Sequence, residues 1–316
     1  MSSGAGGWAG AWSFLPADAA QAWYSEAMST NERQASAPEA RRQVVLVTGA
    51  STGIGRACAD HLAARGWRVY GGSRRAPGGA PAFEALTLDV DDDASVASGV
   101  AQVLAREEHI DVVVNSAGFG IAGAVEDTSI IEAKRQLETN FFGVLRVCRA
   151  VLPSMRAARC GRIVNISSLG GLFGMPFSGL YSASKFALEG VSEAMRQELR
   201  PFGVHVTLIE PGDIRSDFIT TRKSTEESNV NAAYQEGFRR AMKAAEADER
   251  AAPSADLVAQ LVERVLTVRR PRLRYSVGMF SQRIVALLKR WLPERIFEWA
   301  IGQAFKIESV QTKSTS

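Results

Sequence analysis

The sequence predicts an α/β fold: a doubly wound parallel sheet of Rossmann type, in a single domain with a C-terminal helical extension. Three observations predict it: a glycine-rich turn between a strand and a helix near residue 50, an alternation of short apolar runs with helical segments, and two amphipathic segments after residue 277. A chain of 316 residues with 46% hydrophobic content can bury one large core. We therefore expect an N-terminal extension over 1–40, a main domain over 41–277 and a helical tail over 278–316.

The first predicted element is the apolar strand Gln43–Val47, which leads into a glycine-rich turn and then a helix over Arg56–Arg65. Glycine lets the backbone approach a pyrophosphate closely, and the helix N-terminus offers free N–H groups. The spacing is G-x-x-x-G-x-G, not the G-x-G-x-x-G of many dinucleotide enzymes. The turn indicates a dinucleotide phosphate site, and the alternative is an ordinary turn between strand and helix. The expected site residues are Gly49, Ser51, Gly53, Ile54 and Gly55.

The second strand, expected over Trp67–Gly72, ends where the cofactor ribose is selected. A carboxylate there would bind the ribose 2′-hydroxyl and repel a 2′-phosphate. Ser73 stands at that position instead, and Arg74 follows it. A guanidinium grips a phosphate with two parallel charge-assisted hydrogen bonds. The sequence therefore favours NADP over NAD, and the alternative is that Arg74 is a solvated loop charge.

The rest of the main domain continues the alternation that a doubly wound sheet requires. Further strands are expected over Ile110–Val114, over the run Ile163–Ser168, over Val204–Glu210 and over Leu273–Val277. Helices are expected over Asp92–Glu107, Ile131–Ala157, Ser182–Arg200 and Ala255–Leu266. The pattern leaves open whether the helix over Ile131–Ala157 is broken.

Tyr181 and Lys185, on one predicted helix, point to proton transfer. Positions four apart project from the same helix face, one turn apart, so the Lys185 ammonium is expected close to the Tyr181 phenol. A nearby cation favours the phenolate, so we expect Lys185 to lower the Tyr181 pKa towards neutrality. Ser168 lies thirteen positions before Tyr181. The coincidence of these three residues with the glycine turn indicates a hydride-transfer enzyme.

With these motifs the chain resembles the classical short-chain dehydrogenase/reductase family from about Arg42 to about Val277. Further motifs stand in the family's order: Asn115-Ser116-Ala117-Gly118, Thr139-Asn140-Phe141-Phe142-Gly143, Ile163-Val164-Asn165-Ile166-Ser167-Ser168 and Pro211-Gly212. The segment Lys185-Phe186-Ala187-Leu188-Glu189-Gly190 and the basic C-terminus look most like the steroid- and retinol-dehydrogenase-like branch.

The resemblance implies a role for each residue of the site. Tyr181 would be the acid in ketone reduction and the base in alcohol oxidation, and Ser168 would hydrogen-bond the substrate oxygen, where negative charge develops. Lys185 would contact the nicotinamide ribose, and Asn140 would hold a water that links Lys185 to solvent. The cofactor residues implied beyond the glycine turn and Arg74 are Asp89, Val90, Asn115, Tyr181, Lys185, Pro211, Gly212 and Ile214.

The expected substrate is hydrophobic. Apolar residues crowd the predicted site: Phe119, Leu169, Leu172, Phe173, Met175, Phe177, Ile214 and Phe218. No charged residue lies between Ser168 and Tyr181, which argues against phosphorylated or carboxylate substrates. The interpretation is an NADP(H)-dependent oxidoreductase that interconverts an alcohol and a carbonyl on a steroid-, retinoid- or lipid-like molecule. The alternative from another class is a non-catalytic NADP-binding redox-sensing regulator; the glycine spacing disfavours a sugar-nucleotide epimerase.

The tail contains two segments with helical apolar periodicity, Ser281–Trp291 and Pro293–Phe305, among many arginines and lysines. Two roles are open: a cover packed over the pocket, or an interfacial helix that touches anionic lipid as a peripheral membrane contact. We favour the cover, because Trp291 and Trp299 offer large apolar area to bury locally. No run is long enough to span a bilayer. The polar segment Thr220–Glu249 falls where the family carries a substrate lid.

Composition bounds the remaining properties. A net charge of +3 is too small to imply nucleic acid, and His61, His109 and His205 share no metal-ligand spacing. Three cysteines without metal spacing fit reduced thiols and a cytoplasmic location. The family resemblance implies a homodimer or homotetramer. Residues 1–40 are either a flexible extension or, in part, an over-extended gene model that truly starts at Met28.

Overall fold

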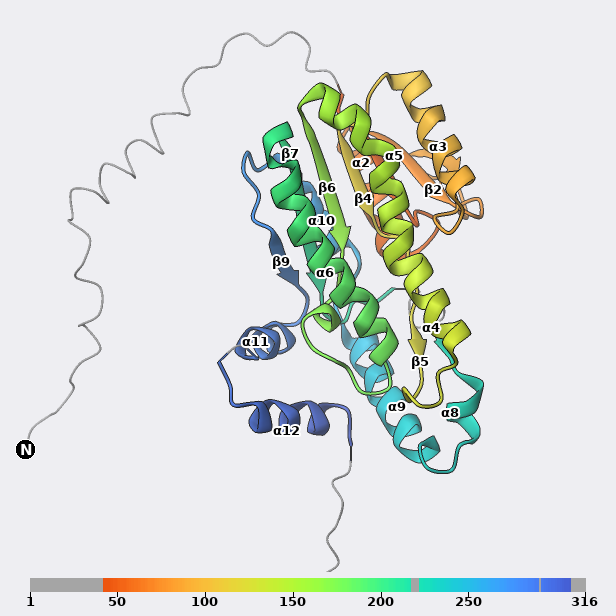
Figure 1. Cartoon of the computed structure of the whole chain (residues 1–316), viewed down its shortest axis with the longest axis vertical. Helices are drawn as coiled ribbons and strands as arrows, with labels where there is room; N and C mark the ends of the chain where they lie inside the picture. Colours follow the sequence, from red (N-terminus) through yellow and green to blue (C-terminus); the bar gives the residue numbers. More distant parts are fainter. Residues whose placement is uncertain (1–41, 217–221, 290, 308–316) are drawn as a thin grey trace, which may run out of the picture. The chain divides into compact units, whose positions relative to one another are not determined.

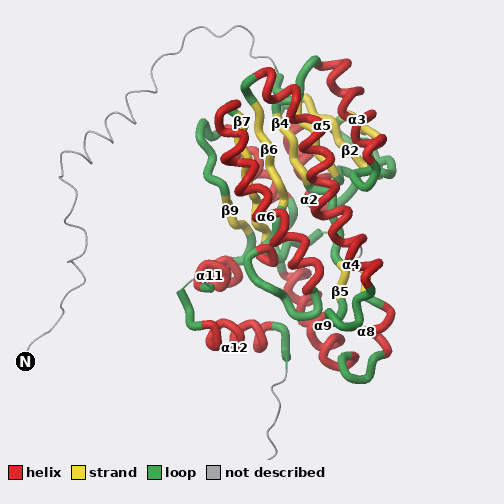
Figure 2. The backbone as a smooth tube through the Cα atoms, viewed as in Figure 1, coloured by secondary structure: helices red, strands yellow, loops and turns green. Residues whose placement is uncertain are grey.

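The computed structural model describes residues 42–216, 222–289 and 291–307, so the predictions for 1–40 and for Phe218 lie outside the described residues. Seven strands form one sheet in the order β3-β2-β1-β4-β6-β7-β9, and every neighbouring pair is parallel (Figures 1 and 2). The predicted doubly wound sheet is confirmed. The strands are β1 (Val44–Thr48), β2 (Arg68–Ser73), β3 (Glu84–Thr87), β4 (Val112–Asn115), β6 (Gly161–Ile166), β7 (Val204–Pro211) and β9 (Arg274–Val277).

Helices cover both faces of the sheet, because alternate side chains of each buried strand point to opposite faces. Val44 and Leu46 join the core under α3 (Asp93–Glu107), α5 (Gly143–Ala158) and α6 (Gly179–Leu199). Val45 and Val47 join the core under α2 (Gly53–Ala64) and α10 (Asp256–Thr267). This two-sided burial explains why β1 reads as a continuous apolar run.

Most predicted elements form within a few residues of their expected bounds, and two regions differ. The helix expected over Ile131–Ala157 is interrupted: α4 (Ile130–Leu137) and α5 are joined by a π-helical turn, Glu138–Phe142. The edge strand β3 was not predicted from the sequence; its burial pattern places only Leu86 fully inside, so it lacks a clear apolar run.

The expected lid region is largely helical. A short strand β8 (Lys223–Ser224) pairs with β5 (Ile121–Ala122), and α8 (Glu226–Val230) and α9 (Gln235–Ala251) follow. Asp127 fixes this region to the domain: its carboxylate accepts hydrogen bonds from Ser228 Oγ at 2.9 Å and Asn231 Nδ2 at 2.6 Å. The part of the lid region that the structure describes is therefore anchored beside β5.

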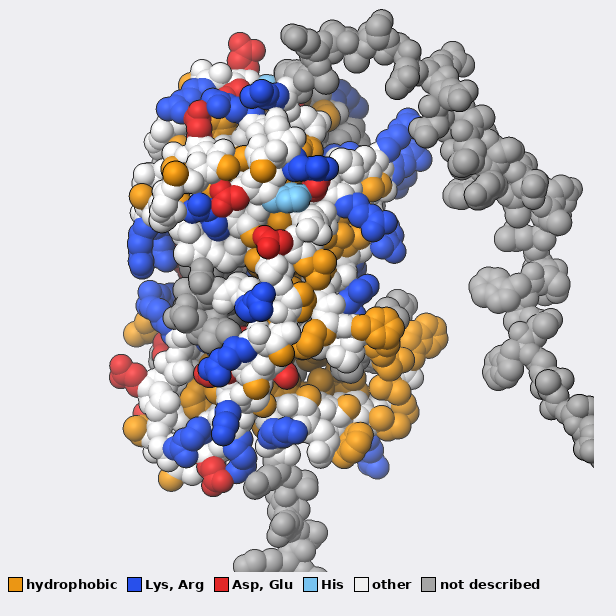
Figure 3. All heavy atoms as spheres, turned by 180° about the vertical axis from the view of Figure 1, so that it is seen from behind, with side chains coloured by type: hydrophobic (Ala, Val, Ile, Leu, Met, Phe, Trp, Pro, Cys, Tyr) orange, Lys and Arg blue, Asp and Glu red, His pale blue; other side chains and the backbone are white. Residues whose placement is uncertain are grey.

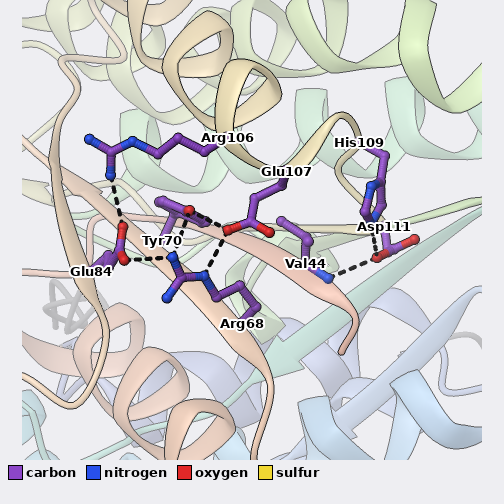
Figure 4. A network of polar contacts seen from close by, with 8 residues as sticks. All are labelled: Val44, Arg68, Tyr70, Glu84, Arg106, Glu107, His109 and Asp111. Atoms are coloured by element: carbon purple, nitrogen blue, oxygen red, sulfur yellow. Dashed lines mark hydrogen bonds and ion pairs between the residues drawn. The ribbon is translucent and has the colours of Figure 1, made fainter. Parts of the chain in front are cut away.

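The two ends of the parallel sheet have different chemistry. Near the amino ends of β1 and β2, an ion-pair network joins Arg68 to Glu84 and Glu107, each at 2.7 Å (Figure 4). Asp111 accepts a hydrogen bond from the Val44 backbone N–H at 2.8 Å in the same region. The carboxyl ends carry the glycine turn and the motifs singled out above, which is where ligands bind in open α/β sheets.

Both tail segments form helices, α11 (Phe280–Leu288) and α12 (Glu294–Ala304). The first starts three residues after β9, and both lie near the carboxyl end of that strand (Figure 1). The tail therefore begins on the same side of the sheet as the glycine turn.

Candidate active site

The glycine turn after β1 has the backbone that the sequence predicted. Gly49 and Gly53 have φ angles of +70° and +59°, in the left-handed region that favours glycine. A Cβ on Gly55 would lie 2.4 Å from the Gly49 carbonyl oxygen, so no larger residue fits there. Helix α2 starts at Gly53 inside this turn, which puts its free N–H groups at the end of β1. This arrangement fits a dinucleotide pyrophosphate.

The ribose-selecting position at the end of β2 is open to a phosphate. Ser73 is buried and donates its hydroxyl to the Arg75 carbonyl at 2.6 Å. The Arg74 side chain is 58% exposed, and its nearest ion-pair contact is Asp91 at 3.9 Å. So long and exposed a contact holds Arg74 weakly. Arg74 is therefore free to turn towards a 2′-phosphate, and no carboxylate ends β2.

The side chains of three other predicted cofactor residues, Asn115, Val90 and Asp89, have contacts within the protein. Asn115 is buried, and its Nδ2 donates to Asn165 Oδ1 at 2.9 Å, so the side chain joins β4 to β6. Val90 is buried against Gly143, where a Cβ on the glycine would lie 2.8 Å from the Val90 side chain. Asp89 Oδ1 accepts from the Asp91 N–H at 3.1 Å. Any contact of Val90 or Asn115 with a cofactor would come from the main chain.

The three residues that predicted proton transfer converge at the carboxyl end of β6. Tyr181 and Lys185 share α6, and a hydrogen bond joins the hydroxyls of Tyr181 and Ser168. Ser168 Oγ also accepts the Gly170 N–H at 3.0 Å, which fixes its side chain at the start of a 3₁₀ turn. Lys185 is buried, and its Nζ donates to the Ile166 carbonyl at 2.8 Å.

The expected effect of Lys185 on Tyr181 is wrong for this arrangement. Burial raises the pKa of Tyr181 to about 12, and the hydrogen bond with Ser168 opposes this rise. Burial also lowers the pKa of Lys185 itself to about 8, although the charge of Glu189 opposes this. The Lys185 Nζ lies 5.8 Å from the centroid of the Tyr181 ring and is engaged with Ile166. Desolvation therefore outweighs the cation, and the phenol stays protonated at neutral pH.

Asn140 lies in the π-helical turn and is almost fully buried. Its Nδ2 donates to the Phe119 carbonyl at 3.0 Å and to Ser184 Oγ at 3.1 Å, and its Oδ1 accepts the Phe119 N–H at 3.0 Å. Ser184 in turn donates to the Tyr181 carbonyl at 2.7 Å. The Asn140 side chain thus ties the loop after β4 to the helix that carries Tyr181, and its expected water-holding role stays a prediction.

The loop after β7 is held by the tail, which the sequence did not predict. Gln282 of α11 accepts the Asp213 N–H at 2.9 Å and donates to the Asp213 carboxylate. A Cβ on Gly212 would lie 2.4 Å from Gln282 Oε1, so the Gln282 side chain would have to move. Pro211 ends β7. Ile214 is buried in the core under α2 and α10, so its side chain does not line a substrate site. The sequence could not predict this contact, because a single glutamine such as Gln282 in an amphipathic segment has no pattern that identifies its partner.

Charged residues of the lid region also reach the site. Arg222 and Glu249 form an ion pair at 2.8 Å, with side chains only 12% and 9% exposed. The charges of Glu249 and Asp213 raise the pKa of Tyr181, whereas Arg222 lowers it. These three residues therefore lie within electrostatic reach of the phenol. The sequence missed them because they are distant along the chain from Ser168 and Tyr181.

The tail also covers the segment that follows Ser168. Phe297 of α12 packs edge-on against Phe173, with ring centroids 5.7 Å apart, and both join Leu169 in a small cluster. Lys289 donates to the Leu172 carbonyl at 2.7 Å. The tail does lie over this segment, but the reason given from sequence is wrong. Trp291 and Trp299 are 78% and 67% exposed, and Phe297 supplies the buried contact.

Comparison with known proteins assigns the family. The model of the short chain dehydrogenase family matches residues 43–227, and the chain belongs to that family. The chain is 40% identical to a 3-ketodihydrosphingosine reductase of Bacteroides thetaiotaomicron over 82% of this chain and 96% of the relative. It is 34% identical to the human 17-beta-hydroxysteroid dehydrogenase type 1, over 80% and 82% of the two chains. The protein is thus an oxidoreductase of the short-chain dehydrogenase/reductase class that acts on CH–OH groups with a nicotinamide cofactor.

Solved structures agree on the fold. A short-chain dehydrogenase from Streptomyces avermitilis is 33% identical with a TM-score of 0.67, over 82% of this chain and 98% of that one. A metagenomic short-chain oxidoreductase solved in complex with NADP is 28% identical with a TM-score of 0.58, over 74% and 96%. Among the described residues, no group of three or more His, Cys, Asp or Glu is placed to hold a metal ion.

Proposed function

We propose that this protein reduces a ketone on a long-chain, lipid-like substrate with NADPH. In this proposal Tyr181 donates the proton to the substrate oxygen, and Ser168 hydrogen-bonds the same oxygen. Lys185 and Asn140 hold the helix and loop that position the phenol. NADPH, when bound, supplies the hydride, and the protein orients and polarises the carbonyl.

One observation carries the proposed chemistry: the hydrogen-bonded hydroxyls of Ser168 and Tyr181, with the phenol held protonated by burial. A carbonyl oxygen gains negative charge as hydride arrives, so two aimed O–H groups stabilise it. A protonated phenol is the acid that reduction needs. The two hydroxyls therefore fit reduction of a carbonyl, and the reductase name of the Bacteroides relative supports that direction.

The preference for NADP rests on Ser73 and Arg74. No carboxylate stands at the end of β2 to repel a 2′-phosphate, and the exposed Arg74 guanidinium offers a phosphate partner. The NADP complex of the metagenomic relative supports the same preference.

The substrate class draws on the site and on the relatives together. The Bacteroides relative is named for a ketone next to an amine-bearing carbon of a long-chain base. Asp213 and Glu249 place two carboxyl groups within electrostatic reach of Tyr181. Arg222 is ion-paired to Glu249 and offsets its charge, so one net negative charge remains near the phenol. That charge would attract a cationic amine beside the carbonyl and would disfavour a carboxylate or phosphate there. The apolar segment Leu169–Met175 supports an alkyl chain as the remainder of the substrate.

The test is NADPH oxidation, followed by absorbance, with 3-ketodihydrosphingosine, its N-acetyl derivative, a steroid ketone and retinal. We expect the free amine to be reduced with a kcat/KM at least about tenfold above that of the N-acetyl derivative, which has the same chain and carbonyl without the charge. Tyr181→Phe is the control for chemistry. It should lose on the order of 10²-fold or more in kcat while NADPH binding stays nearly intact.

Other results would redirect the assignment. Equal rates for the amine and its N-acetyl derivative would remove the role of the carboxylates. Preference for the steroid would move the substrate class to that of the human relative. A folded protein that binds NADPH and reduces none of these compounds would favour the non-catalytic regulator.

A further inference from the structure

Helix α12 is apolar on two faces, and the domain covers only one of them. Phe297 is 8% exposed and packs with Ile301 against the segment after Ser168. Ile296 and Trp299 are 50% and 67% exposed. At about 100° per residue they lie some 100° and 160° around the helix from Phe297. A helix that needed only to pack on the domain would not require this second apolar face.

The uncovered face of α12 continues into neighbouring parts of the tail. Trp291, between the two helices, is 78% exposed, and Phe280 at the start of α11 is 74% exposed. Figure 3 shows hydrophobic side chains gathered over α11 and α12. We call this surface the tail patch, and its members are Phe280, Leu288, Trp291, Ile296, Trp299 and Ile307. Exposed large apolar side chains that gather in this way mark an interaction surface.

Positive charges lie beside the tail patch. Arg295 is four residues before Trp299 on α12, so it projects from nearly the same side of the helix, and it is exposed. Lys306, which follows the end of the helix, is also exposed. Glu294 and Glu298 are each two residues, or about 200° of rotation, from Ile296 and so lie on its far side. Residues 280–307 contain five Lys or Arg and two Glu, a net charge of +3.

We propose that the tail patch docks this protein on an anionic lipid surface. Tryptophan rings settle at the headgroup level of a bilayer, and flanking Lys and Arg pair with anionic lipids. Contact between two copies through the same patch would be isologous and would bring like charges together. The charge pattern therefore favours lipid over a second copy. No helix among the described residues combines the length and apolarity needed to cross a bilayer.

Docking would place lipid next to the site. Helix α12 contacts Phe173 with its inner face, so the lipid surface would lie about one helix diameter, roughly 10 Å, from the segment after Ser168. An apolar substrate dissolved in the bilayer would then have a short path to Tyr181. The docking itself follows from the patch and does not depend on the proposed substrate.

The test is cosedimentation of the full-length chain with vesicles of phosphatidylcholine alone and of an equal mixture with phosphatidylglycerol. We expect binding to the mixed vesicles at least about tenfold tighter than to neutral ones, and weaker in high salt. The double variant Trp291→Gln, Trp299→Gln should lose about tenfold or more of the binding. The matched control is Ile130→Gln, Ile131→Gln on α4, where two side chains of comparable exposure are removed from another surface. It should bind vesicles like the original protein.

Two further measurements separate the outcomes. The tryptophan variant should reduce a short, water-soluble ketone at the original rate, which shows that its fold is intact. Light scattering reports whether it changes the oligomeric state. The proposal is overturned if the original protein ignores anionic vesicles, or if the tryptophan variant binds them as well as the original does. It is also overturned if the variant dissociates an oligomer while neither protein binds vesicles, because the patch is then a contact between copies. Failure of every ketone assay would remove the proposed reaction and leave the docking result standing.

Discussion

The glycine turn and the C-terminal tail both lie at the carboxyl ends of the strands, but different parts of the chain carry their roles. In the turn, the backbone carries the function: Gly49 and Gly53 have positive φ angles, and a Cβ on Gly55 would collide with the Gly49 carbonyl. In the tail, side chains carry it, and α12 presents apolar residues on two faces. Residue type alone therefore predicts the turn, whereas the role of α12 depends on which face meets Phe173.

The sharpest test of this contrast is to add one methyl group at a glycine in each region. Gly55→Ala puts a Cβ against a backbone oxygen at 2.4 Å, so we expect a loss of about 1–3 kcal/mol or more in unfolding free energy and the loss of NADPH binding. Gly302→Ala in α12 meets nothing within 4 Å. It should instead gain roughly 0.5–1 kcal/mol from helix propensity. Urea unfolding and NADPH titration measure both, and similar losses in the two variants would refute the contrast.

The buried Lys185 of α6 predicts how the free energy of unfolding depends on pH. Its pKa falls from 10.5 to about 8 on burial, so the unfolded chain keeps a proton that the folded chain releases between about pH 8 and 10.5. The folded protein therefore gains stability relative to Lys185→Met as pH rises through this window. Across this pH window, the difference in unfolding free energy between the original protein and Lys185→Met should change by on the order of 3 kcal/mol. The buried thiols Cys58 and Cys148 titrate in both proteins and cancel in this difference. A pH-independent difference in urea unfolding would show that Lys185 is not desolvated.

At the nucleotide end, Arg74→Asp should swing the preference from NADP towards NAD. The change removes the phosphate partner and installs a carboxylate that repels the 2′-phosphate. We expect the ratio of kcat/KM for NADPH and NADH to change by about ten- to a hundredfold, the scale of a lost charge-assisted contact. Arg75→Asp is the matched control one residue along. If both variants shift the ratio equally, Arg74 acts only through general charge.

The contact between the tail and the site gives the smallest expected effect. Gln282→Leu removes the acceptor of the Asp213 N–H, a loss of about 1 kcal/mol, so the KM for NADPH should rise several-fold. Gln303→Leu on the exposed side of α12 is the control and should leave this KM unchanged. Equal KM values in the two variants would show that Gln282 packs the tail without positioning the loop after β7.

The sequence by itself determined the order of the main strands and helices apart from the edge strand β3 and the lid region, together with the glycine turn and the shared helix of Tyr181 and Lys185. These features follow from local rules: glycine where φ is positive, apolar runs in strands buried on both faces, and one helical turn between positions four apart. Tertiary structure decided the rest. It set the protonation of Tyr181 through burial, brought Asp213, Arg222 and Glu249 within electrostatic reach of the phenol, and chose Phe297 over Trp299 as the buried residue of α12. The burial of an ionisable group, and the choice of which helix face is buried, depend on residues distant in the chain. A local sequence pattern therefore cannot predict them.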